Sequence, residues 1–294
     1  MKSVKSKLLN LTKVDKRSNL SQKELFKEYI EPEIPVVLTD AAKDWEAIGK
    51  FTPAFFKQNY PNLSKTLDGV TYKMDDFIDR MLASTPENVA PYPYNFNVEE
   101  YFPELLQYMK PEILFAKSDR VNHKLTPKFL FGNTHRYELF FGGKGAKWYT
   151  LHVDALCLHT QITQVYGAKT FFLYSPDQTP YLYPDPEQVK QSLVNVFTPD
   201  YKKFPLFSQA KCVQVTVEQG ETLLFPKGWW HTTEMNGPCI TLGRVQLNAA
   251  NWKDFCDDNY DSWKKKNNML RVPAYMYARL LGHAMNMQES LTSK

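Results

Sequence analysis

The sequence has few cysteines, no long apolar run and little net charge, and each of these absences excludes a class of protein. Its four cysteines are widely separated and form no C-x-x-C pair, which argues against a zinc module or a disulfide framework. No apolar run approaches the roughly 18 residues that a membrane span requires, so we expect no membrane partner. The net charge is only +4 and the basic residues are scattered, so we expect no nucleic-acid partner.

The remaining composition is that of a globular protein with a sizeable core. Hydrophobic residues make up 43% of the chain and charged residues 23%, which is ordinary for soluble domains. Aromatic residues are abundant at 14%, which suits a β-rich fold with a roomy interior. The apolar stretch within the first ten residues is too short for a secretion signal, and the cysteine spacing fits a reducing compartment, so we expect a cytoplasmic protein.

Local patterns divide the chain into a lead-in at residues 1–24, a main domain at residues 25–250 and a helical extension at residues 251–294. The first part of the main domain mixes helices and strands. Capping signals, apolar runs and proline-rich stretches predict a helix opened by Ser21 and Glu24, a strand at Pro35–Thr39, a helix opened by Thr52 and Pro53, a helix at Met74–Met81 and an extended loop at Pro86–Pro103.

From about residue 129 the pattern changes to short strands separated by turn residues. Eight such strands at this spacing predict a mainly β fold, a double-stranded β-helix or jelly-roll barrel with flanking helices. They are expected at Tyr137–Phe141, Tyr149–Asp154, Thr160–Tyr166, Lys169–Tyr174, Cys212–Val217, Thr222–Phe225, Trp230–Glu234 and Ile240–Leu247. An insert at Asp177–Gln209 interrupts the series, and helices are expected at Trp252–Lys266 and Val272–Met287.

Three side chains in this β region form a candidate metal site. His152 and Asp154 stand two apart on an expected strand and would project from the same face. If His231 comes up beside them, two imidazoles and one carboxylate meet, which is the facial triad of a non-haem Fe(II) site with open positions for substrates and O2. The tripeptide alone is a weak signal, but a polar histidine after two tryptophans in a buried β layer needs a partner.

Lys169 is the second element of this hypothesis. It begins an apolar strand just past Gly167, where an ammonium group pointing into a barrel would be costly unless an anion met it. The far carboxylate of a dicarboxylate bound to the iron would be such an anion. A surface lysine whose charged end reaches solvent is the alternative interpretation.

The motifs that contain these residues resemble the JmjC and cupin-like family of 2-oxoglutarate oxygenases, nearest its hydroxylase branch. The resemblance covers roughly residues 25–250 and rests on ordered motifs at compatible spacing. The principal motifs are Leu151-His-Val-Asp154, Gln164-Val-Tyr-Gly-Ala-Lys169 and Gly220-Glu-Thr-Leu-Leu-Phe-Pro-Lys-Gly-Trp-Trp-His231.

The resemblance implies a catalytic domain that binds Fe(II) through His152, Asp154 and His231, with Lys169 on the distal carboxylate of 2-oxoglutarate. It further implies reaction with O2 that releases succinate and CO2 and hydroxylates a C–H bond of an amino-acid side chain or a small molecule. Five more residues are candidates for contacts to the co-substrate: Thr160, where relatives place an asparagine, and Tyr94, Thr150, Gln246 and Asn248.

Several alternatives remain open at this stage. An N-methyl demethylase would use the same iron chemistry, whereas a three-histidine cupin dioxygenase would need a histidine in place of Asp154. A cupin-like module that only binds a partner is a third possibility, against which the ligand set and Lys169 both argue. The apolar C-terminal helices are expected either to form a homodimer interface or to pack on their own barrel.

Overall fold

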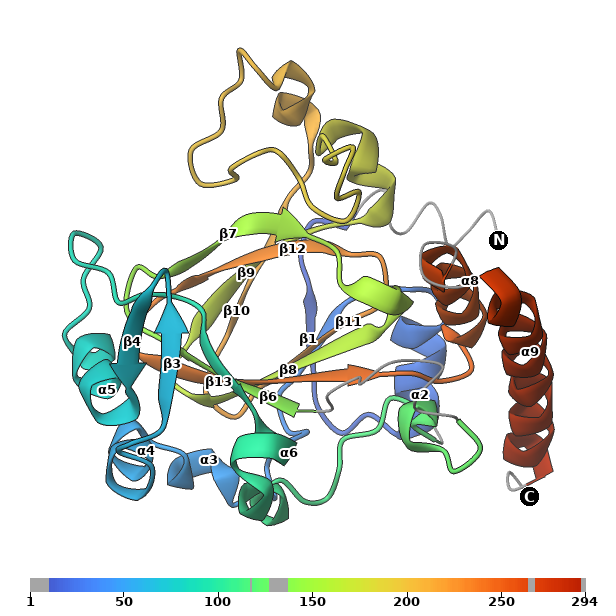
Figure 1. Ribbon diagram of the computed structural model, residues 1–294, viewed down its shortest axis with the longest axis horizontal. Helices are drawn as coiled ribbons and strands as arrows, with labels where there is room; N and C mark the ends of the chain where they lie inside the picture. The colour runs from blue at the N-terminus through green and yellow to red at the C-terminus, as the bar shows by residue number, and fades with distance from the viewer. Residues whose placement is uncertain (1–10, 117, 127–136, 264–267, 292–294) are drawn as a thin grey trace.

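The computed structural model describes residues 11–116, 118–126, 137–263 and 268–291. Two antiparallel sheets dominate it, and they lie face to face in the centre of the molecule (Figure 1). The larger sheet has the strand order β1 (Asp15–Arg17), β2 (Val36–Leu38), β11 (Thr222–Phe225), β8 (His159–Tyr166), β13 (Cys239–Gln246), β6 (Tyr137–Gly142) and β5 (Tyr94–Asn97). The smaller sheet has the order β10 (Val213–Val217), β9 (Lys169–Tyr174), β12 (Trp230–Met235) and β7 (Lys147–His152).

This arrangement confirms the predicted jelly-roll class, with flanking helices and without a fully closed barrel. All eight predicted strands of the second half are present within two residues of their expected ends. The part of the chain around residue 129, where the barrel was expected to begin, lies outside the described residues. The first described strand after it is β6. Strand β1 pairs with β2 in parallel, and every other pairing in the two sheets is antiparallel.

Short helices from the first part of the chain cover the outer face of the larger sheet (Figure 1). Ser21 and Glu24 form the predicted capping box, and Thr52 caps the helix that Pro53 begins. The elements of this part are α2 (Gln22–Leu25), the π-helical turn η1 (Phe26–Ile30), α3 (Ala47–Lys50), α4 (Pro53–Asn59), α5 (Met74–Leu82), α6 (Val98–Tyr101) and the 3-10 turns η2 (Pro103–Tyr108) and η3 (Arg120–Asn122). Their buried aromatic side chains pack on β6 and form the largest apolar core.

Besides β1, three strands of this part were not expected. Strands β3 (Ser64–Leu67) and β4 (Val70–Lys73) form a hairpin whose two central residues, Asp68 and Gly69, both have positive φ. An Asp-Gly pair between short alternating runs is the usual signal of such a turn. The stretch at Pro86–Pro103, expected as a loop, contains β5, which extends the larger sheet by pairing with β6. The expectation failed because this pairing depends on a distant partner strand.

The insert and the C-terminal helices complete the molecule. The insert holds the 3-10 turns η5 (Pro176–Tyr181) and η6 (Pro205–Gln209) and packs on the outer side of the smaller sheet. Helix α8 (Trp252–Trp263) lies against α9 (Asn268–Leu291) at one side of the barrel (Figure 1). Gly282 permits this contact, because a Cβ atom there would lie 2.3 Å from the indole nitrogen of Trp252. Among the described residues, no helix is long and apolar enough to cross a membrane.

Candidate metal centre and its cavity

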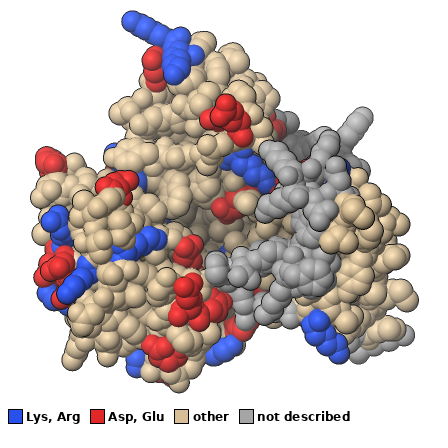
Figure 2. All heavy atoms as spheres, in the orientation of Figure 1, with Lys and Arg blue, Asp and Glu red and all other residues tan. Residues whose placement is uncertain are grey.

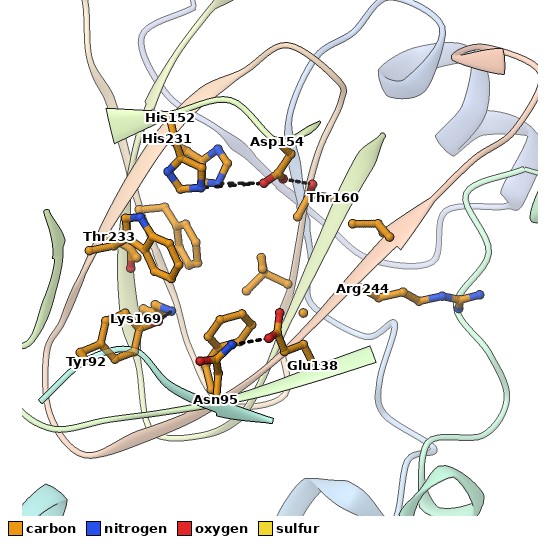
Figure 3. Close-up of a pocket in the computed structure, with 16 residues that line it drawn as sticks. Tyr92, Asn95, Glu138, His152, Asp154, Thr160, Lys169, His231, Thr233 and Arg244 are labelled. Atoms are coloured by element: carbon orange, nitrogen blue, oxygen red, sulfur yellow. Dashed lines mark hydrogen bonds and ion pairs between the residues drawn. The ribbon is translucent and has the colours of Figure 1, made fainter. Parts of the chain in front are cut away.

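Two histidines from neighbouring strands meet in the space between the sheets (Figure 3). His152 ends β7, and the antiparallel register places it directly opposite His231 on β12, with 4.2 Å between the ring centroids. The Oδ1 atom of Asp154 lies 3.8 Å from the Nε2 atom of each histidine. The structure therefore brings the three predicted side chains together. Elsewhere in the described ranges, no group of three His, Cys, Asp or Glu side chains converges in this way.

Asp154 reaches this position by a different route from the predicted one. Strand β7 ends at His152, so the two residues do not share a strand as expected. Asp154 instead precedes the short turn η4 (Ala155–Cys157), in which Leu156 and Cys157 have φ values of 61° and 50°. These left-handed conformations turn the chain sharply toward β8. The carboxylate is held beside the histidines by the turn rather than by strand alternation.

Both histidines present the same nitrogen to the centre of the triad. The Nδ1 atom of His152 lies 3.0 Å from the carbonyl oxygen of Thr150, and that of His231 lies 3.2 Å from the carbonyl of Trp229. A carbonyl oxygen only accepts hydrogen bonds, so each Nδ1 carries a proton and each Nε2 is the atom that faces Oδ1 of Asp154. Burial, followed by the neighbouring His152, lowers the pKa of His231 to about 4, which keeps this imidazole neutral at pH 7. This tautomer is the one that binds a metal ion.

Thr160 fixes the orientation of the carboxylate. Its hydroxyl donates a hydrogen bond to Oδ2 of Asp154, which leaves Oδ1 directed toward the two histidines. The 3.8 Å separations are too long for hydrogen bonds and suit atoms that share an ion. Two imidazoles and one carboxylate, which directs a single oxygen toward them and is open on one side to a cavity, are the donor set expected for non-haem Fe(II).

The cavity below the triad has a volume of about 450 Å³. Lys169 extends into it from β9, and only 3% of its surface is exposed. Its Nζ atom donates a hydrogen bond of 2.9 Å to the hydroxyl of Tyr92 and lies 5.3–5.6 Å from the ring centres of Tyr92, Phe140 and Phe171. The described residues place no carboxylate in ion-pair contact with it, and burial lowers its pKa to about 8. The site therefore has a buried cation suited to receive an anionic ligand.

Residues 54–244 match the model of the cupin-like domain. The chain belongs to this family. JmjC-type enzymes within it are dioxygenases that use Fe(II) and 2-oxoglutarate, and the donor set and the buried lysine of this chain fit both groups. The predicted family resemblance is thus confirmed.

Three kinds of curated protein are similar in sequence to this cupin-like chain. The chain is 32% identical to HSPB1-associated protein 1 of Rattus norvegicus over 133 residues, which is 40% of the chain and 26% of the relative. It is 26% identical to lysine-specific demethylase JMJ21 of Arabidopsis thaliana over 83% of the chain and 26% of the relative. It is also 34% identical to tRNA wybutosine-synthesizing protein 5 of Gallus gallus over 44% of the chain and 38% of the relative. The matched region thus spans about a quarter to two fifths of these relatives.

Four of the predicted co-substrate residues do not project into the cavity of the cupin-like domain. Tyr94 stacks on Phe77 in the core, with 3.7 Å between the ring centroids, and its hydroxyl contacts backbone carbonyls. Gln246 bonds to the backbone of the 111–116 segment, and Asn248 caps the turn before α8. Thr150 contributes its carbonyl to His152 rather than its hydroxyl to the cavity. Thr160 does line the cavity, but its hydrogen bond goes to Asp154.

Other lining residues were missed by the sequence reasoning. Tyr92, two residues before Tyr94, is the tyrosine that contacts Lys169. Thr233 follows His231 by two residues on β12, so strand alternation was a signal that could have identified it. On the opposite wall, Asn95 donates a hydrogen bond to Glu138, and both side chains face the cavity (Figure 3).

Proposed function

We propose that this protein is an Fe(II)- and 2-oxoglutarate-dependent hydroxylase. The observation that carries the proposal is the pairing of two features in one cavity. A triad of two imidazoles and one carboxylate lies at one end, and the buried ammonium of Lys169 lies further inside (Figure 3). A chelating 2-oxo acid with a second carboxylate complements both ends at once.

The residues of the chain have separate tasks in this proposal. His152, Asp154 and His231 hold the ion, and Lys169 with Tyr92 holds the far carboxylate of the co-substrate. When bound, the iron supplies the oxidative chemistry by which O2 and 2-oxoglutarate yield succinate, CO2 and a hydroxylated C–H bond. Aromatic side chains line much of the cavity, and this apolar lining strengthens the electrostatic contacts inside it.

For the substrate, we propose an amino-acid side chain in a protein or peptide, or a small molecule. The face over the barrel is hollowed near its centre, and charges of both signs lie around the hollow (Figure 2). A transfer RNA would require a continuous basic surface to meet its phosphates. The described lysines and arginines on this face do not form one (Figure 2). We further propose a cytoplasmic location, consistent with four free cysteines.

N-methyl demethylation is the second candidate, because the match to a lysine-specific demethylase extends over 83% of the chain. One assay separates the two reactions. The protein is incubated with Fe(II), 2-oxoglutarate and a panel of peptides with and without methylated lysine, and succinate and intact peptide masses are measured. A gain of one oxygen supports hydroxylation, whereas loss of a methyl group supports demethylation. If the wild-type protein forms no more succinate than the His152→Ala variant, the proposed oxygenase activity is wrong.

A further inference from the structure

Helix α8 contacts the chain segments that carry all three of the metal-binding side chains. Asn251 directly precedes this helix, and Asp254 and Asp258 follow at helical spacing, so the three side chains lie along one face. The helix begins at Trp252, outside residues 54–244 that match the family model. Each of the three polar side chains on this face reaches a different ligand segment.

The contact to the segment of His152 runs through the insert. The Oδ2 atom of Asp258 lies 2.5 Å from the Nζ atom of Lys190, and both side chains are partly buried. The carbonyl oxygen of Lys190 accepts a hydrogen bond of 2.9 Å from the N–H of Val153. The next residue of the insert, Gln191, forms an antiparallel β-bridge with His152 itself. The ion pair therefore ties α8 to the strand edge beside this ligand.

The second contact reaches the segment of His231. The Oδ2 atom of Asp254 lies 3.1 Å from the Nζ atom of Lys227, which also forms an ion pair with Glu33. Lys227 lies in the turn before β12, and His231 is the second residue of that strand. Its backbone N–H donates a hydrogen bond of 3.2 Å to Nδ1 of His159, so the turn is held by both its side chain and its backbone.

The third contact lies beside Asp154. The side-chain amide of Asn251 donates a hydrogen bond of 3.0 Å to the carbonyl oxygen of Cys157, which ends the turn η4 that follows Asp154 directly. Leu156 and Cys157 have positive φ in this turn, a conformation that persists only where the surrounding structure holds it. All three ligand segments are therefore attached to one helix.

We propose that α8 positions the three metal ligands relative to one another, with the Asp258–Lys190 ion pair as a principal contact, an inference that rests on the function proposed above. A site binds a metal ion tightly when the surrounding structure already holds its ligands at the required geometry. Partly exposed ion pairs contribute little to folding stability, because solvent screens them. The contacts of α8 therefore affect metal affinity more strongly than they affect the unfolding temperature.

Two adjacent aspartates of α8 provide a matched pair of variants. Asp257 forms ion pairs with Lys253 of the same helix and with Arg279 of α9, at 2.6 Å and 3.6 Å, whereas Asp258 reaches Lys190 of the insert. Asp258→Asn keeps the shape and removes the charge, so we expect the Kd for Mn(II) to rise roughly threefold to tenfold. Asp257→Asn should leave this Kd unchanged. Each variant should lower the Tm by less than about 3 °C.

The test is calorimetric titration of the metal-free proteins with Mn(II), extended by a reversal of the ion pair. Lys190→Glu and Asp258→Lys should each weaken binding roughly tenfold, and the double variant should return to within about twofold of the wild type. An unchanged Kd for Asp258→Asn, an equal loss for Asp257→Asn, or a double variant as weak as the single ones overturns the positioning role of α8 alone. If the wild-type protein binds no Mn(II), the proposed function fails together with this inference.

Discussion

Replacing Lys169 by methionine should stabilise the ligand-free protein while removing tight binding of 2-oxoglutarate. The ammonium group is buried, and burial lowers its pKa from 10.5 to about 8. At 1.36 kcal/mol for each pH unit, keeping the charged form buried at pH 7 costs about 3 kcal/mol. Methionine has a similar length and carries no charge, so the substitution removes this cost.

Two losses offset part of the gain. The hydroxyl of Tyr92 loses the donor that lies 2.9 Å away, and the rings of Phe140 and Phe171 lose a cation near their centres. Together these contacts contribute about 1–2 kcal/mol. We therefore expect the free energy of unfolding of Lys169→Met to be about 1–2 kcal/mol higher than that of the wild type at pH 7.

The pH dependence gives this prediction a second check. Because the pKa of Lys169 is lower in the folded protein than in the unfolded chain, the cost is present in full below about pH 8. It declines as the pH rises toward 10.5, since the folded protein loses its proton first. Between pH 7 and pH 9.5 the free energy of unfolding of the wild type should therefore rise by about 2 kcal/mol relative to that of the variant.

The assay is urea unfolding of both proteins at the two pH values, with Lys144→Met as a control at an exposed lysine. The control should change the unfolding free energy by less than about 0.5 kcal/mol at either pH. Calorimetric titration should show that Lys169→Met weakens 2-oxoglutarate binding by roughly a hundredfold or more. If Lys169→Met is less stable than the wild type at pH 7, or if the difference is the same at both pH values, the reasoning about the buried charge is refuted.

Three further predictions follow from the same structure. Thr160→Val frees Oδ2 of Asp154, so the affinity for Mn(II) should fall roughly tenfold by calorimetry, and an unchanged affinity contradicts the orienting role. The KM for 2-oxoglutarate should rise about tenfold per pH unit above pH 8 as Lys169 loses its proton, and a flat profile to pH 9.5 argues against this contact. Helix α9 exposes Met276 and Leu280 on its outer face, and we propose a homodimer through it; light scattering should then show a monomer for Leu280→Glu but a dimer for the wild type.

The fold of the barrel was predictable because its strands are short, β-branched or aromatic, and separated by glycine and proline. Runs such as Lys169–Tyr174 and Thr222–Phe225 have the same ends in the structure as in the sequence pattern. The first part was harder to predict, because β5 depends on pairing with a strand that follows it by about 40 residues. The Asp68-Gly69 turn, in contrast, was a local signal that could have identified the hairpin of β3 and β4.

The candidate site was predictable where chemistry restricts the choice of residue. Few side chains bind iron, and a lysine inside an apolar strand requires an explanation, so His152, Asp154, His231 and Lys169 could be singled out. The contacts around these residues could not be predicted, because they depend on how loops and strands meet in space. Tyr92 lies in a stretch expected to be an extended loop, and only its packing on the two sheets brings its hydroxyl to Lys169.

The central claim is that the triad and Lys169 together hold Fe(II) and 2-oxoglutarate, and anaerobic absorption spectroscopy tests it most directly. Adding Fe(II) and 2-oxoglutarate to the wild-type protein should produce a weak visible charge-transfer band. The His231→Ala variant should not show the band although its far-ultraviolet circular dichroism matches that of the wild type. The absence of any band from folded wild-type protein, with no succinate formed when air is admitted, would contradict the account.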